Sequence, residues 1–169
     1  DSEISSTPSE SRPSESKPTE SQPSQSQIEE VPTEITGGDL PLDRERSYLF
    51  VPVGTTVAKL RGQIPHGSGD LDVLRANGTL VSGGKIGTGM TLRLRTNGKL
   101  VDSVTLVVLG DLNGTGTVNS KDVTLLYDHL LEKISLEEPY FSAADWNGDG
   151  DLNTLDLLLL KRSLDGTLE

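Results

Sequence analysis

Two twelve-residue segments carry the oxygen-rich side chains with which this chain could do chemistry. The first runs from Asp111 to Asp122 and the second from Asp145 to Asp156, at an offset of 34 residues. Both have Asp at position 1, Asn at 3, Gly at 4 and 6, Asn at 9 and Asp at 12. Two matched patterns at one offset indicate an internal duplication.

The spacing predicts calcium ligands. Ca²⁺ takes six to eight oxygens, and a twelve-residue loop supplies them from positions 1, 3, 5, 7, 9 and 12, with Gly at position 6 for a sharp turn. The first set would be Asp111, Asn113, Thr115, the carbonyl of Thr117, Asn119 and Asp122. The second would be Asp145, Asn147, Asp149, the carbonyl of Asp151, Asn153 (directly or through water) and Asp156. The two loops predict two calcium ions. Because Thr115 stands where the second loop has the carboxylate of Asp149, we expect the second site to be filled first.

Apolar residues follow each loop, so each loop is predicted to lead into a helix. The segment before Asp111, residues 104–109, is rich in β-branched residues and resembles a strand instead of an entering helix. The expected unit is therefore loop–helix, repeated twice. This pattern, with Asp at position 12 and Leu160-Lys161-Arg162 after the second loop, resembles the type I dockerin domain over about residues 110–168.

The resemblance implies a partner and a location. Dockerins bind calcium and a cohesin module on a scaffoldin, and so assemble polysaccharide-degrading complexes outside the cell. We therefore expect a non-catalytic, secreted protein that is monomeric by itself. An EF-hand-type calcium sensor or buffer is the main alternative, which the missing entering helices and Asp at position 12 disfavour.

The second helix is the predicted partner-binding element. At 100° per residue, Leu157, Leu160 and Leu164 share one face and should lie in the core. The resemblance and the opposite apolar face together give the predicted binding set, which is Thr154, Leu155, Leu158, Leu159, Lys161 and Arg162. The first helix has mostly polar residues at the corresponding positions, so we expect one binding orientation.

Charge divides the chain into three parts. The formal net charge is −11, with a net of −7 over residues 1–47, +4 over 48–109 and −8 over 110–169. The acidic totals argue against nucleic acid as a partner. The absence of Cys excludes disulfides and zinc–thiolate sites. No run of about 20 apolar residues predicts a membrane span, and a chain that starts within a linker is expected to be a fragment of a longer protein.

The predicted domains are a disordered Pro/Ser/Glu-rich linker over 1–46, a small α+β module over 47–109 and a dockerin over 110–169. Residues 7–26 are four near-copies of a Pro-containing pentapeptide with almost nothing apolar to bury. Ile35 and Leu40 are too sparse to predict a core. The predicted fold class is thus multi-part: a linker, an α+β module and an all-α dockerin with two calcium loop–helix (F-hand) repeats.

Residues 47–109 predict about five strands and one short helix. Thr56 is a candidate N-cap before Val57, Leu60 and Ile64, and the Asn77-Gly78 and Asn97-Gly98 pairs predict hairpin turns. The layout resembles small modules that often precede dockerins, and its last strand should pass directly into Asp111, so the two modules should pack together. Its single His, few acids and two aromatic residues do not predict catalysis; glycan binding by this module is a further alternative.

Overall fold

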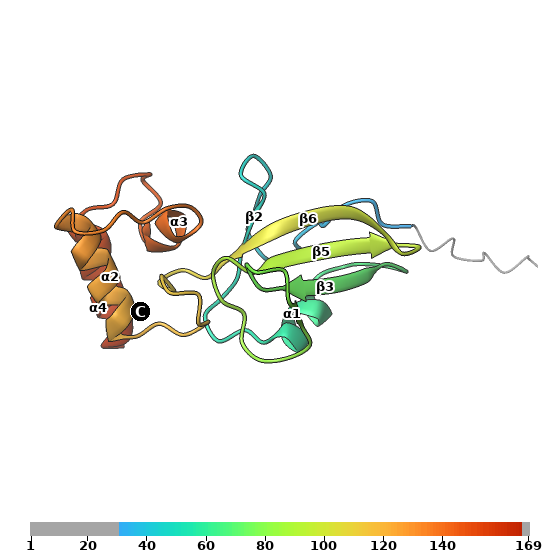
Figure 1. The fold of residues 1–169 in the computed structure, drawn as a ribbon, viewed down its shortest axis with the longest axis horizontal. Helices are drawn as coiled ribbons and strands as arrows, with labels where there is room; N and C mark the ends of the chain where they lie inside the picture. The colour runs from blue at the N-terminus through green and yellow to red at the C-terminus, as the bar shows by residue number, and fades with distance from the viewer. Residues whose placement is uncertain (1–30, 167–169) are drawn as a thin grey trace, which may run out of the picture.

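A computed structural model describes residues 31–166. Its centre is a six-stranded mixed sheet with the strand order β1-β2-β6-β5-β3-β4 (Figure 1). The strands are β1 Leu42–Asp43, β2 Tyr48–Phe50, β3 Asp70–Leu74, β4 Leu80–Val81, β5 Thr91–Thr96 and β6 Lys99–Val107. The helices are α1 Val57–Gln63, α2 Ser120–Leu130, α3 Tyr140–Ala144 and α4 Thr154–Leu164.

Local signals account for several of these elements. Strand β5 alternates buried and accessible residues, as a strand with one covered face should. Asn97 and Gly98 both have positive φ, 51° and 76°, and join β5 to β6 in a two-residue turn that matches the twist of the hairpin. The side chain of Thr56 caps α1 by accepting the N–H of Lys59 at 3.3 Å. These features confirm the predicted hairpin turn at 97–98 and the predicted start of the helix.

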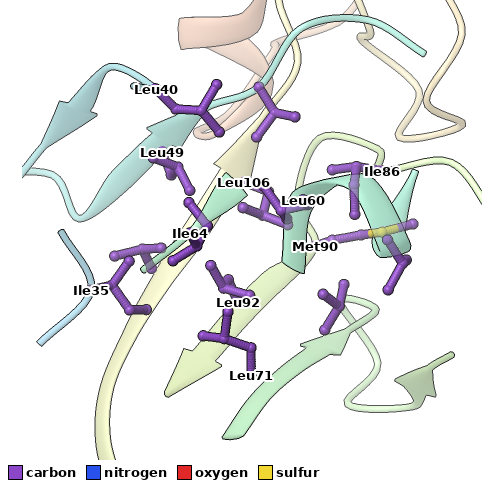
Figure 2. Close-up of a cluster of buried hydrophobic side chains, with 14 of the residues drawn as sticks. Ile35, Leu40, Leu49, Leu60, Ile64, Leu71, Ile86, Met90, Leu92 and Leu106 are labelled. Atoms are coloured by element: carbon purple, nitrogen blue, oxygen red, sulfur yellow. The ribbon is translucent and has the colours of Figure 1, made fainter. Parts of the chain in front are cut away.

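One face of the sheet and helix α1 enclose the larger hydrophobic core. Leu60 on α1, Leu92 on β5 and Leu106 on β6 are all completely buried (Figure 2). At about 25 cal/mol per Å² of buried apolar surface, this core is the main source of stability for this part of the chain.

Residues 31–46 belong to this core, which the sequence analysis did not expect. Ile35 is completely buried and Leu40 is 9% exposed, so the prediction that they are too sparse for a core is wrong. Asp102 on β6 holds the segment, because its Oδ2 accepts the N–H of Ile35 at 2.7 Å and a guanidinium N–H of Arg44 at 2.8 Å. Burial raises the pKa of Asp102 and these hydrogen bonds lower it. The net result is a pKa below its usual range. Strand β1 then adds to the sheet edge by pairing with β2.

The other face of the sheet carries the second core. Tyr48 and Phe50 of β2 and Val107 of β6 join the cluster formed by buried residues of α2, α3 and α4. Figure 1 shows α3 between the sheet and the α2–α4 pair. The expectation that the sheet and the helical part pack together is therefore confirmed.

The predicted fold class is wrong. The described chain is built on a mixed six-stranded sheet with few, mostly short helices, and its C-terminal part is not an all-α unit. Two physical causes explain the difference. The two ligand loops occupy much of that part without regular structure, and its core is completed by side chains from β2 and β6. The domain boundaries at 46/47 and 109/110 stay predictions, and the pentapeptide repeats lie outside the described residues.

Candidate calcium centres and partner-binding face

The first loop brings four of its predicted ligands together in pairs. The N–H of Thr115 donates to both Asp111 Oδ1, at 3.0 Å, and Asn113 Oδ1, at 3.1 Å. Two oxygens that share one donor must lie close together, so positions 1 and 3 converge. The Thr115 hydroxyl lies 3.3 Å from the carbonyl oxygen of Thr117, which brings positions 5 and 7 together.

The second loop repeats this arrangement. The N–H of Asp149 donates to Asp145 Oδ1, at 3.2 Å, and to Asn147 Oδ1, at 3.0 Å. Asn153 Nδ2 lies 3.5 Å from the carbonyl oxygen of Asp151, so positions 7 and 9 are also adjacent. The duplication read from the sequence is therefore a duplication of local geometry.

Positions 9 and 12 start the helices. In each repeat the Asn side chain accepts an N–H of the first helical turn, while the Asp carboxylate accepts the N–H of that same Asn, at 2.9 Å for Asp122 and 3.0 Å for Asp156. This is a capping box. The other oxygen of each Asp accepts the N–H of position 2, Leu112 or Trp146, at 2.9 Å. Position 12 thus ties the end of each loop to its beginning and aims its carboxylate inward.

The donor set fits calcium. Within residues 31–166 no group of three or more His, Cys, Asp or Glu side chains that could hold a metal ion is present, and amide, hydroxyl and carbonyl oxygens supply half or more of each predicted ligand set. Such neutral oxygens suit a hard cation that takes six to eight ligands. Burial raises the pKa of Asp122, the N–H groups of Asn119 and Leu112 oppose this, and the negative charge of Asp111 adds to the rise. A divalent cation in this loop would relieve the repulsion between the two carboxylates.

The surroundings of the two loops differ. Asp111 is completely buried, and its Oδ2 accepts the N–H of Thr88 from the sheet at 2.9 Å. Asp145 is only partly buried, and Asn147, Asp149 and Asp151 are exposed. Thr88 is a site residue that the sequence analysis missed. Its only local signal is the Gly87-Thr88-Gly89 pattern, because paired glycines permit close backbone approach as well as turns.

The two loops are also entered differently. Strand β6 ends at Val107, just before loop one, as expected. Loop two is preceded by α3, so the prediction that neither loop has an entering helix is wrong for the second repeat. Helix α3 is only five residues long and is anchored by Glu138, whose Oε2 accepts the hydroxyl of Ser142 at 2.7 Å. So short a helix has no apolar periodicity by which to predict it.

Helix α4 presents most of the predicted partner-binding set to solvent. Leu155 is 45% exposed and Leu158 44%, and Thr154, Lys161 and Arg162 are exposed as well, whereas Leu159 is half-buried. Leu157 and Leu160 lie in the core as predicted. Leu164 does not: it is 39% exposed, because it is the last residue of α4 and extends beyond the core.

The first repeat lacks this apolar surface. At the matching positions of α2, Lys121 and Thr124 are exposed, Leu125 packs partly against the second core, and Asp128 forms an ion pair with Lys133 at 3.1 Å. Tyr127, at the position that matches Lys161, is an exposed aromatic residue, and Leu131 and Ile134 are exposed beyond the matching positions. The corresponding faces of the two helices are therefore chemically different.

Comparison with known proteins defines the class of this part of the chain. Residues 109–165 match the family model described as the dockerin type I domain. This segment is a type I dockerin domain, as the sequence resemblance indicated. No curated protein matches the chain.

The match carries general properties of the class. Dockerins are non-catalytic, typically calcium-binding modules with cohesin as their partner, and they occur in extracellular cellulosome-type complexes. The matched residues include both ligand loops and the whole of α2, α3 and α4. The match begins after the end of β6. No helix in the described part of the chain is long and apolar enough to cross a bilayer.

Proposed function

We propose that this chain is a non-catalytic assembly component that binds two calcium ions and, in that state, a cohesin module on a scaffoldin. By this binding it joins an extracellular, polysaccharide-degrading complex as a secreted, otherwise monomeric protein. The observation that carries the proposal is the duplicated loop–helix geometry within the dockerin segment, in which positions 1 and 3 converge on one N–H and position 12 caps the following helix.

Asp111, Asn113, Thr115, the Thr117 carbonyl, Asn119 and Asp122 hold the first ion in this proposal, and the corresponding residues of 145–156 hold the second. The carboxylates of positions 1 and 12 close the loops by accepting backbone N–H groups, and each carboxylate has at least one oxygen that accepts a single N–H and keeps a lone pair for a metal. In this proposal the same side chains close each loop and hold its ion.

Cohesin binding is assigned to α4. Leu155, Leu158 and Leu159 form an apolar stripe on a face that would otherwise meet water, with Lys161 and Arg162 beside it. Apolar surface with Arg at its edge is typical of the centre of an interface. Since α2 has no equivalent stripe, the partner binds in one orientation.

The test is a binding assay of the full chain against a panel of purified cohesin modules. We expect at least one cohesin to bind in millimolar calcium, to dissociate after chelation with EDTA, and to rebind when calcium is restored. Binding that is unchanged by EDTA, or no binding to any type I cohesin, would contradict the proposal.

A further inference from the structure

Loop one is enclosed by a segment that lies outside the dockerin domain. Residues 85–90 connect β4 to β5 and pass directly over the loop. Ile86 and Met90 anchor the segment from both sides, since they are completely and 95% buried in the larger core (Figure 2). The Ile86 N–H also donates to the Thr55 carbonyl at 2.8 Å, and the Met90 carbonyl accepts the N–H of Leu106 at 2.7 Å.

Thr88, between these anchors, is bonded to the start of the loop by three hydrogen bonds. Its N–H donates to Asp111 Oδ2 at 2.9 Å. Its hydroxyl donates to the Val108 carbonyl at 3.1 Å and accepts the Val108 N–H at 3.0 Å. Thr88 is 2% exposed and Asp111 is not exposed at all, so these bonds lie out of water, where a missing partner is costly.

The backbones approach so closely that side chains would not fit between them. A Cβ atom on Gly87 would lie 2.2 Å from the Gly114 carbonyl oxygen, and one on Gly116 would lie 2.4 Å from the Ile86 carbonyl oxygen. Gly89 and Gly114 both face the hydroxyl of Tyr140. Glycines from both parts of the chain thus permit the contact, which closes the loop on this side and leaves Thr115 exposed on the other.

We propose that residues 85–90 form part of the first calcium site: they hold the Asp111 carboxylate in place and enclose the loop, so that the calcium affinity of loop one depends on docking of the sheet. Loop two has no such neighbour, since Cβ atoms at Gly148 and Gly150 would meet nothing within 4 Å. This inference rests on the proposed calcium binding. Because coupling between two events is reciprocal, calcium in loop one should also stabilise docking of the sheet.

Two glycines of the full chain provide a matched test. Gly87→Ala places a methyl group against the Gly114 carbonyl, whereas Gly83→Ala adds the same methyl in the neighbouring turn with nothing within 4 Å. Neither residue has a positive φ, so neither change strains the backbone by itself. A calcium titration followed by NMR at the Gly116 and Gly150 amides reports on each loop separately.

We expect Gly87→Ala to raise the calcium Kd reported by Gly116 about tenfold or more and to change the Kd reported by Gly150 less than about twofold. We expect Gly83→Ala to change neither Kd. Equal Kd values in the two variants, or an equal loss at both loops, would overturn the inference. If the wild-type chain binds no calcium, the proposed calcium function fails as well. If it binds two ions and the variants agree, only the inference fails.

Changed chemical shifts of the β5 and β6 amides would show that Gly87→Ala disrupts the sheet. A second variant tests the proposal in that event. Thr88→Val removes the hydroxyl that bonds to Val108 but keeps the backbone N–H and the side-chain shape. We expect a rise of a few-fold in the Kd of loop one alone. An unchanged Kd at loop one would then overturn the proposal.

Discussion

The two repeats of the dockerin domain share their local geometry and differ in what surrounds them. Loop one is enclosed on one side by residues 85–90, and the helix that follows it exposes mainly polar residues at the positions that match the proposed binding face of α4. Loop two is open, and its helix exposes an apolar stripe. Under the proposed function, this difference divides one duplicated unit between two tasks: the first repeat attaches the domain to the sheet, and the second presents a surface to a partner.

The largest expected effect concerns the two helix faces. The double change Leu158→Asp with Arg162→Asp should weaken cohesin binding by roughly 100-fold or more, because it places charge in the centre of the apolar stripe. The matched change in the first repeat, Thr124→Asp with Asp128→Arg, should cost less than about threefold. Surface plasmon resonance in calcium measures both. Equal losses of cohesin affinity, or a greater loss from the change in the first repeat, would contradict the proposed division of tasks.

The first ligand of each loop gives the next comparison. In metal-free protein, Asp111→Ala should lower the free energy of unfolding by about 2–4 kcal/mol, because the N–H groups of Thr88, Thr115 and Gly116 lose a buried acceptor. Relief of the repulsion with Asp122 offsets a small part of this cost. Asp145→Ala should cost only about 1 kcal/mol, since water can reach the N–H groups that it releases. Urea denaturation in EDTA measures the free energy of unfolding of both variants. Equal losses of this free energy would show that burial of loop one has no energetic consequence.

The position-6 glycines isolate the contact with the sheet. Gly116 and Gly150 have φ values of 74° and 87°, so Ala at either position should cost about 1–2 kcal/mol in backbone strain. Gly116→Ala should cost about 1–3 kcal/mol more, because its Cβ would meet the Ile86 carbonyl oxygen. The same denaturation experiment measures the difference. If the two variants are equally stable, the contact at Ile86 adjusts without cost.

The smallest expected effect is in the salt dependence of calcium binding. The predicted ligands of loop two include the carboxylates of Asp145, Asp149 and Asp156, with the exposed carboxylate of Asp151 nearby, whereas those of loop one include only Asp111 and Asp122. Exposed charges are screened by salt and buried ones much less. Raising KCl from about 0.05 to 0.5 M should weaken binding at loop two about three- to tenfold and at loop one less than about twofold. A larger loss at loop one would contradict this assignment of charge and burial.

Sequence reasoning succeeded where the rule is local. The ligand spacing, the Asn–Asp capping boxes and the Asn97-Gly98 turn each depend on residues within one short segment. The outward and inward faces of α4 also followed from helical period, except at Leu159, which is half-buried, and at Leu164, which lies at the end of α4 beyond the core.

Sequence reasoning failed where segments far apart in the chain are in contact. Ile35 packs in the larger core, and Asp102, 67 residues away, accepts its N–H; no local pattern shows either contact. The burial of Asp111 depends on Thr88 in the same way, since the glycines around Thr88 are equally compatible with an open turn. The all-α expectation failed for this reason too: β2 and β6 complete the core between the helices.

The most direct test of the division of tasks is the position of the bound cohesin. The methyl resonances of Leu155, Leu158 and Leu159 report on the second repeat, and those of Leu125 and Leu131 report on the first. On addition of one equivalent of a cohesin that binds in calcium, we expect the α4 methyl groups to shift or broaden and those of the first repeat to remain unchanged. Shifts confined to the first repeat, or two populations with each repeat affected in one, would contradict the account.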